Sequence, residues 1–178
     1  MEELLEEIRL AIGHKLYYLA LFATITIPDI CSALESEDYK TSGREYRKWF
    51  DQYIAKINPH KYGINGTLTS NHLYKIRCSL LHQGMSGDKT DYARMLFLEP
   101  GTPGYESLQS IHCCIVGNKT ENQSLLVNII EFCNDMSIGA KEWLKDNKNS
   151  EIYKRNYNNM IRRHPNGISP VFGTSVIG

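Results

Sequence analysis

The sequence has no excess of charge of either sign, because 20 lysines and arginines balance 20 aspartates and glutamates among its 178 residues. A protein that binds nucleic acid over a broad surface usually carries a basic excess. Any contact with RNA must therefore depend on a local group of basic side chains.

The sequence also has no secretory signal, no long apolar run and no paired cysteines. It begins with acidic residues, where a secretory signal is basic. Its most apolar stretch, residues 16–30, is shorter than the roughly twenty residues of a membrane span. The five cysteines include no C-x-x-C pair, and their number is odd. These features predict a cytoplasmic protein with reduced thiols.

Hydrophobic residues make up 42% of the chain and charged residues 22%, which is typical of a globular protein. The length fits one domain over residues 1–178, with a core over about 14–145 and a C-terminal helix and extended tail over 151–178. Apolar residues repeat mainly at three- and four-residue steps, so the predicted fold is mainly α.

The first half of the chain predicts several helices. Residues 1–34 are expected to form two helices that separate at Gly13, and Pro28 is expected to kink the second helix or to start a new one. Residues 43–57 form an amphipathic pattern whose aromatic side chains are assigned to the core or to a dimer surface. A further helix is expected to follow the capping residue Thr69.

The second half predicts a β-hairpin followed by a long helix. Residues 94–98 and 111–116 are short apolar runs separated by a loop rich in glycine and proline, which indicates a hairpin. The spacing of Thr120 and Gln123 is that of a capping box, so a long helix is expected to open there and to continue to about residue 146.

The strongest chemical signal lies in the segment that ends Arg77-Cys-Ser-Leu-Leu-His82-Gln-Gly84. Helical stepping places Arg77 in the middle of an apolar face, where a guanidinium needs a partner or a ligand. His82 lies about 140° further round the helix. The two side chains are therefore expected to converge only if the helix loosens near Gly84, or if a second copy of the protein contributes its own pair.

This segment resembles the Arg-x4-His signature of HEPN proteins, many of which are metal-independent ribonucleases. In one branch of that superfamily an Ile-Pro-Asp-Ile-Cys run precedes an Arg-Cys-Ser-Leu-Leu-His run, and both stand here, at residues 27–31 and 77–82. The resemblance covers roughly residues 14–145. It implies a HEPN-like helical bundle with the hairpin inserted before the last long helix.

The resemblance also implies the site and its setting. Arg77 and His82 would be catalytic, in a homodimer with two such pairs facing one cleft, with no cofactor and no metal. The expected role is in toxin–antitoxin or antiphage systems, with RNA as substrate and an antitoxin protein as partner. Cys78 departs from the pattern, because many active members have Asn, Asp or His directly after the arginine.

The same residues also have purely structural interpretations. Arg77 has Asp29 as its simplest structural partner, and Asp29 either holds Arg77 for function or only neutralises it. His82 fits a helix end, where a positive imidazole is favourable. A non-catalytic HEPN-like dimer that binds a nucleotide, RNA or a protein is the alternative function, favoured by Cys78 and by the neutral overall charge.

Two weaker groups complete the candidates. His112, Cys113 and Cys114 are metal-ligand types, but adjacent strand residues point to opposite faces, so strand core is expected and not a metal site. A basic group assigned to the last helix is the best place for phosphate contacts. Its members are Lys154, Arg155, Arg162 and Arg163.

Overall fold

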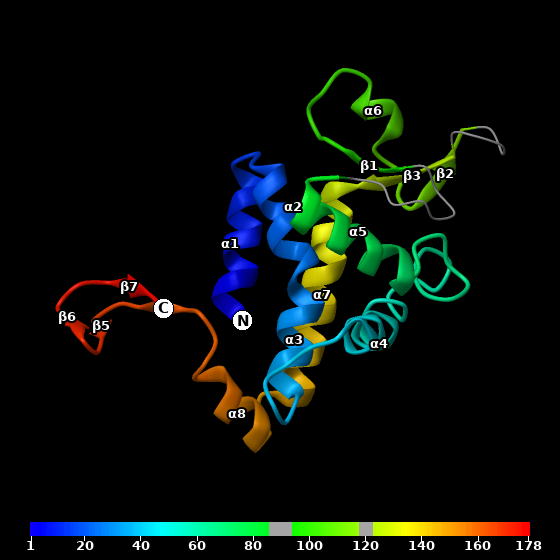
Figure 1. Cartoon of the computed structure of the whole chain (residues 1–178). Coiled ribbons are helices and arrows are strands. Elements are labelled where there is room, and N and C mark those ends of the chain that lie inside the picture. The colour runs from blue at the N-terminus through cyan, green and yellow to red at the C-terminus, as the bar shows by residue number, and fades with distance from the viewer. Residues whose placement is uncertain (86–93, 118–122) are drawn as a thin grey trace.

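The computed structural model describes residues 1–85, 94–117 and 123–178. It is mainly helical, with small sheets (Figure 1). The helices are α1 (Glu2–Gly13), α2 (Tyr17–Ile25), α3 (Ile27–Glu35), α4 (Gly43–Tyr53), α5 (Ser70–Gln83), α6 (Tyr105–Leu108), α7 (Ile129–Asn147) and α8 (Glu151–Tyr157). The strands are β1 (Arg94–Leu98), β2 (Cys114–Val116), β3 (Ser124–Asn128), β4 (Arg163–His164), β5 (Gly167–Ile168), β6 (Val171–Phe172) and β7 (Val176–Ile177).

The first helices break close to the predicted places. Helix α1 ends at Gly13, and Lys15 takes a positive φ of 59° before α2 begins. Helix α2 stops at Ile25, and Pro28 occupies the first turn of α3, where its missing N–H costs no hydrogen bond. The second alternative for Pro28 is thus confirmed: it starts a new helix.

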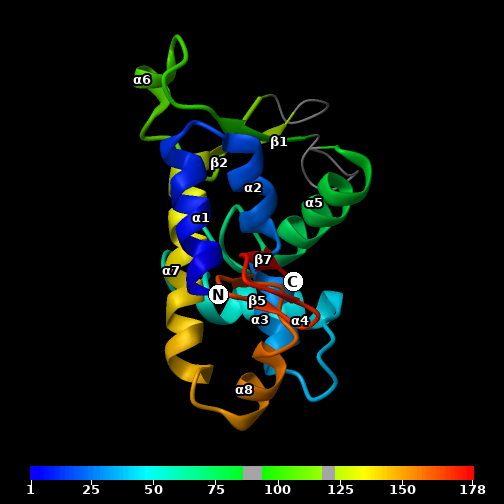
Figure 2. The same cartoon turned by 90° about the vertical axis from the view of Figure 1, so that its left-hand side faces the viewer.

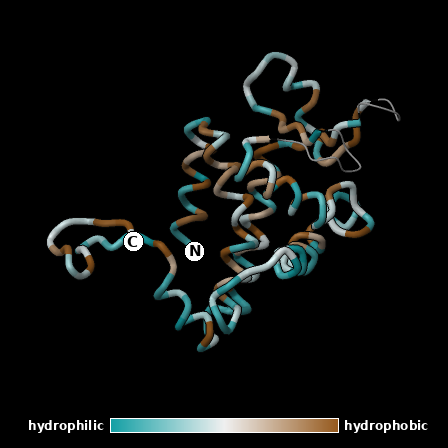
Figure 3. The backbone as a smooth tube through the Cα atoms, in the orientation of Figure 1, coloured by the Kyte–Doolittle hydropathy of each residue, from teal (hydrophilic) through white to brown (hydrophobic). Residues whose placement is uncertain are grey.

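Helix α7 is the longest helix described and contacts α1, α2, α3 and α4 (Figures 1 and 2). Hydrophobic and hydrophilic residues alternate along the helices (Figure 3). The buried residues of α7 are Ile129, Phe132, Cys133, Met136, Gly139, Ala140, Trp143 and Leu144. One side of a long helix therefore supplies much of the core.

The predicted start of this helix is wrong. Residue Thr120 lies outside the described residues, and the stretch after Gln123 is strand β3, with Leu125 and Val127 fully buried. Helix α7 begins only at Ile129, because the side chain of Asn128 accepts the backbone N–H groups of the first turn. The cap at Asn128 thus takes the place of the capping box predicted at Thr120 and Gln123.

The predicted β-hairpin is also wrong. Strands β1 and β2 do not pair with each other, because β3 lies between them in the order β1-β3-β2. Strand β1 runs parallel to β3, with Met95 opposite Leu125, and β2 runs antiparallel to β3. Strand β2 starts only at Cys114, because Cys113 has a positive φ of 56° that interrupts extended backbone.

The segment Tyr17–Glu35 is long and apolar enough to cross a membrane by length and composition, contrary to the estimate from residues 16–30. It is divided between α2 and α3, and 56% of its most apolar window is buried inside the molecule. Such burial is typical of the core helix of a soluble protein.

The C-terminal segment contacts the rest of the bundle by its helix α8, which packs against α3. The side-chain amide of Asn156 donates to the carbonyl oxygens of Leu34 and Ser36 at 3.2 and 2.7 Å. The tail beyond it is largely extended, as predicted, in short two-stranded pairs. Arg162 and Arg163 follow α8 and do not belong to it, so their assignment to the last helix is wrong.

Candidate functional site

Helix α5 carries the Arg–His motif, begins after Thr69 as predicted, and has well-defined ends. At its start the hydroxyl of Thr69 accepts the backbone N–H of His72, and the His72 ring accepts the backbone N–H of Thr69. At its end Gly84 takes the left-handed conformation, with φ 67°, which glycine adopts without strain. These ends place Arg77 in the middle of the helix and His82 in its last turn.

Arg77 is held by Asp29 across two helices. Its Nε donates to the Asp29 carboxylate at 2.7 Å, and the side chains are 22% and 14% exposed. Asp29 stands in the first turn of α3, where the helix dipole favours a negative charge. The predicted ion pair between these residues is confirmed.

Arg77 also reaches His82 within the same chain. Its Nη1 lies 3.4 Å from Nε2 of His82. The expectation that the two side chains diverge on one straight helix is therefore wrong, because the long arginine side chain spans the four intervening residues. Since guanidinium has only donors, Nε2 of His82 is the acceptor, and the neutral ring carries its proton on Nδ1.

Burial and the ion pair act in opposite directions on the pKa values of Asp29 and Arg77. Burial raises the pKa of Asp29, and the hydrogen bond from Arg77 opposes that rise. Burial alone would lower the pKa of Arg77, but its contacts with Asp29 outweigh this effect and raise that pKa. Arg77 is therefore oriented by Asp29 and keeps its positive charge.

Cys78 is half-buried beside the pair. Its interaction with the hydroxyl of Tyr74, one helical turn earlier, raises the pKa of that hydroxyl. Cys78 also interacts with the Arg77 side chain. The residue that departs from the HEPN pattern thus lies at the site.

The predicted phosphate contacts lie elsewhere. Residues of α8 and the tail are at the end of the bundle away from α5 (Figures 1 and 2). Three of these cations face glutamates, and the guanidinium of Arg162 lies over the Tyr157 ring, 5.0 Å from its centroid. The pairs are Lys154 with Glu151 at 2.7 Å, Arg155 with Glu37 at 3.5 Å, and Arg163 with Glu7 at 2.9 Å. The structure does not bring these residues to Arg77 and His82.

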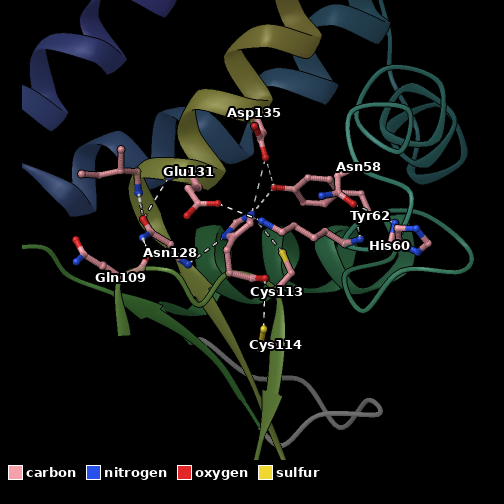
Figure 4. Close-up of polar contacts among 12 residues, drawn as sticks. Asn58, His60, Tyr62, Gln109, Cys113, Cys114, Asn128, Glu131 and Asp135 are labelled. Atoms are coloured by element: carbon pink, nitrogen blue, oxygen red, sulfur yellow. Dashed lines mark hydrogen bonds and ion pairs between the residues drawn. The ribbon is translucent and has the colours of Figure 1, made fainter. Parts of the chain in front are cut away.

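A second polar cluster includes Tyr62, Asn128 and Asp135 (Figure 4), and His112 is hydrogen-bonded to two of them. The backbone N–H of Asn128 donates to Nδ1 of His112 at 3.2 Å, so the neutral ring has its proton on Nε2. That proton faces the Tyr62 hydroxyl at 2.5 Å, and Tyr62 donates to Asp135 at 2.6 Å. A directed chain of hydrogen bonds therefore runs from the ring to the carboxylate.

Most residues of this cluster are buried, which favours a structural role. Burial lowers the pKa of His112, and burial raises the pKa of the Cys113 thiol to about 12, which leaves it unreactive. The expectation that neighbouring residues point to opposite faces is wrong here, because Cys113 Sγ lies 3.4 Å from His112 Nε2. Within residues 1–85, 94–117 and 123–178, no three His, Cys, Asp or Glu side chains are arranged to hold a metal ion.

Sequence reasoning missed Tyr62 and Asp135. They are single residues far apart in the chain, at a loop and on α7, and no spacing connects them to His112. A histidine that interrupts an apolar stretch was the sole signal, because a buried imidazole needs partners.

Comparisons with protein-family models, with curated proteins and with solved structures find no match for this chain.

Proposed function

We propose that this protein is a metal-independent endoribonuclease with a HEPN-like fold. The observation that carries the proposal is the contact between Arg77 and His82 on α5, with Asp29 orienting the arginine. A fixed guanidinium beside an exposed neutral imidazole is a suitable pair for cleaving a phosphodiester, since one stabilises charge and the other moves a proton.

The reaction would be attack of the RNA 2′-hydroxyl on its own phosphorus. His82 accepts the 2′-hydroxyl proton on Nε2, its unprotonated ring nitrogen, as the 2′-oxygen–phosphorus bond forms and the Arg77 guanidinium turns from Nε2 to the phosphate. The bond from phosphorus to the 5′-oxygen breaks, and that oxygen takes a proton from the imidazolium. Arg77 binds the non-bridging oxygens with its planar fork. The products are a 2′,3′-cyclic phosphate and a 5′-hydroxyl.

A homodimer is part of the proposal. Three residues at the start of α2 are apolar and exposed, namely Leu16 at 49%, Tyr18 at 78% and Leu19 at 60%. Burying such residues on a second copy would be favourable. Light scattering at tens of micromolar tests this part, and a monomer there would remove it.

The biological role proposed from the HEPN resemblance is in a toxin–antitoxin or antiphage system in the cytoplasm, with an antitoxin protein as partner. The second candidate function is a HEPN-like dimer that binds a nucleotide, RNA or protein without cutting. Cys78 is the observation that favours it, because many active HEPN proteins have Asn, Asp or His at the corresponding place of the motif.

The test is incubation of the purified protein with single-stranded RNA in EDTA. We expect cleavage that leaves 2′,3′-cyclic phosphate ends. His82→Ala should lower the rate about 10²–10⁴-fold through loss of acid–base catalysis. Arg77→Lys should restore little of the activity lost in Arg77→Ala, because an ammonium cannot bind bidentately.

A wild-type protein that leaves every RNA intact would contradict the ribonuclease proposal. Retained RNA binding that depends on Arg77 would then support the binding module. Cleavage that EDTA abolishes would point to a metal and contradict the mechanism.

A further inference from the structure

Arg47 on α4 has a different environment from the other cations of its helix. Arg44 and Lys48 both pair with Glu45. Arg47 forms no ion pair with any of the residues that the structure describes, and its guanidinium carbon lies over the ring of Tyr74, 4.9 Å from the centroid. A half-buried guanidinium is thus held by an aromatic face and has no direct ion pair, while the Asp51 carboxylate one helical turn later feels its charge, which lowers the pKa of that carboxyl.

The ring that supports Arg47 is itself fixed. A Cβ atom at Gly43 would come within 2.6 Å of Cζ of Tyr74, so the ring packs directly on the glycine backbone. Tyr46, which is fully buried, lies 5.4 Å from Tyr74 between ring centroids, at an angle of 60°. The Tyr74 ring, which we call the platform, is therefore held in place by the core and supports the Arg47 guanidinium.

This platform adjoins the Arg–His pair. Tyr74 precedes Arg77 by three residues and Cys78 by four, the spacings that place side chains on one helix face. The charges of Arg47 and Arg77 both act on the Tyr74 hydroxyl and lower its pKa against the larger effect of Cys78, which raises it. Helices α4 and α5 are also in direct contact. Tyr74 therefore lies close enough to both Arg47 and Arg77 for each charge to act on its hydroxyl.

We propose that Arg47, positioned by Tyr74, binds a backbone phosphate of single-stranded RNA next to the phosphate that Arg77 and His82 act on. This inference rests on the proposed function for its ligand, but not on cleavage. A guanidinium stacked on an aromatic ring keeps its edge N–H groups for a bidentate contact with phosphate oxygens. Arg47 thereby replaces the basic group of α8 and the tail, three of whose cations pair with glutamates, as the proposed phosphate site.

The experiment measures binding of uncleavable 2′-O-methyl oligonucleotides over a range of salt concentrations. A tetranucleotide offers phosphates beside the central one, whereas a dinucleoside monophosphate offers a single phosphate. We expect Arg47→Gln to weaken tetranucleotide binding and to reduce the slope of log affinity against log salt by about 0.7, the loss of one phosphate contact on a single strand. Binding of the dinucleoside monophosphate should be unchanged, which also shows that the variant is folded.

Arg44→Gln is the matched control, because Arg44 lies on the same helix and is already paired with Glu45. Its slope should equal that of the wild type. Tyr74→Phe should also behave as wild type, since the ring remains, while Tyr74→Leu should weaken tetranucleotide binding.

An Arg47→Gln slope equal to that of the wild type would overturn this inference alone and leave the ribonuclease proposal standing. Equal weakening of both oligonucleotides would also overturn it, since Arg47 would then contact the scissile phosphate. A wild type that binds neither oligonucleotide, and that cuts no RNA, would overturn the inference and the proposed function together.

Discussion

The guanidinium of Arg77 joins α5 to the first turn of α3, with its Nε 2.7 Å from the Asp29 carboxylate. The same guanidinium contacts His82 through Nη1. Asp29 therefore fixes the position of the arginine relative to the imidazole, and one ion pair connects the packing of the bundle to the geometry of the proposed site.

Replacement of Asp29 by Asn should reduce the free energy of unfolding. It leaves Arg77 with an uncompensated charge in a largely buried place, and breaking a buried pair costs up to about 3–5 kcal/mol. Urea denaturation measures the change. Glu37→Gln is the control, because its pair with Arg155 is exposed and should contribute under about 1 kcal/mol. Equal effects from the two variants would show that Asp29 and Arg77 do not interact in solution.

The Cys78→Asn variant separates the two candidate functions. If the thiol only replaces a polar orienting group, Asn should keep or raise the rate of RNA cleavage. In the binding-module case the wild type is inert, and the Asn variant gains cleavage or remains inert as well. Initial rates with one RNA substrate decide between these results. Lower activity in Cys78→Asn than in Cys78→Ala would count against an orienting role for this position.

His112 should make stability depend on pH in the acid range. Burial lowers its pKa from 6.5, so the unfolded chain binds a proton more readily than the folded one. The free energy of unfolding should therefore fall as pH drops below about 6.5 towards the folded pKa. A proton on Nδ1 would also oppose the N–H of Asn128.

The His112→Gln variant is the control for this pH dependence. Its side-chain oxygen can accept from Asn128, but it does not titrate. The difference in unfolding free energy between wild type and variant should narrow as pH falls from 7 to about 5. A constant difference over that range would show that His112 does not titrate differently in the folded and unfolded states.

Gly139 provides a packing test on α7. Alanine there gains up to about 1 kcal/mol of helix propensity, but its Cβ would overlap Cδ1 of Ile54, a fully buried residue. Overpacking of a core costs about 1–3 kcal/mol, so Gly139→Ala should lower the melting temperature. Adding Ile54→Val, which removes that methyl group, should restore part of the loss. A double variant whose destabilisation equals the sum of those of Gly139→Ala and Ile54→Val would contradict this contact.

The sequence was sufficient for the helical half of the fold and for the chemical pair. Thr69 and Gly84 mark the ends of α5 through local hydrogen bonds and backbone conformation, which depend on nearby residues alone. Arg77 and Asp29 are charges within apolar helices, and the need to compensate each other predicted their contact.

The sheet could not be predicted in the same way. Strand β1 pairs with β3 in parallel, a pairing between distant segments that no local pattern encodes. The Val-Asn-Ile-Ile sequence at the junction fits a helix stripe as well as a strand, and only the cap at Asn128 separates the two. Arg47 was missed because its significance depends on Tyr74, which lies on another helix.

The packing of α7 against four other helices has a consequence for synthesis of the chain. The residues of the Arg–His site all leave the ribosome before Ile129, yet α1 to α4 pack on a helix that runs to Asn147. A nascent chain stalled before that point contains every proposed catalytic group but lacks α7. Such a chain is expected to expose apolar surface and to be prone to aggregation. The fold that holds the proposed site can therefore form only after translation has passed Asn147.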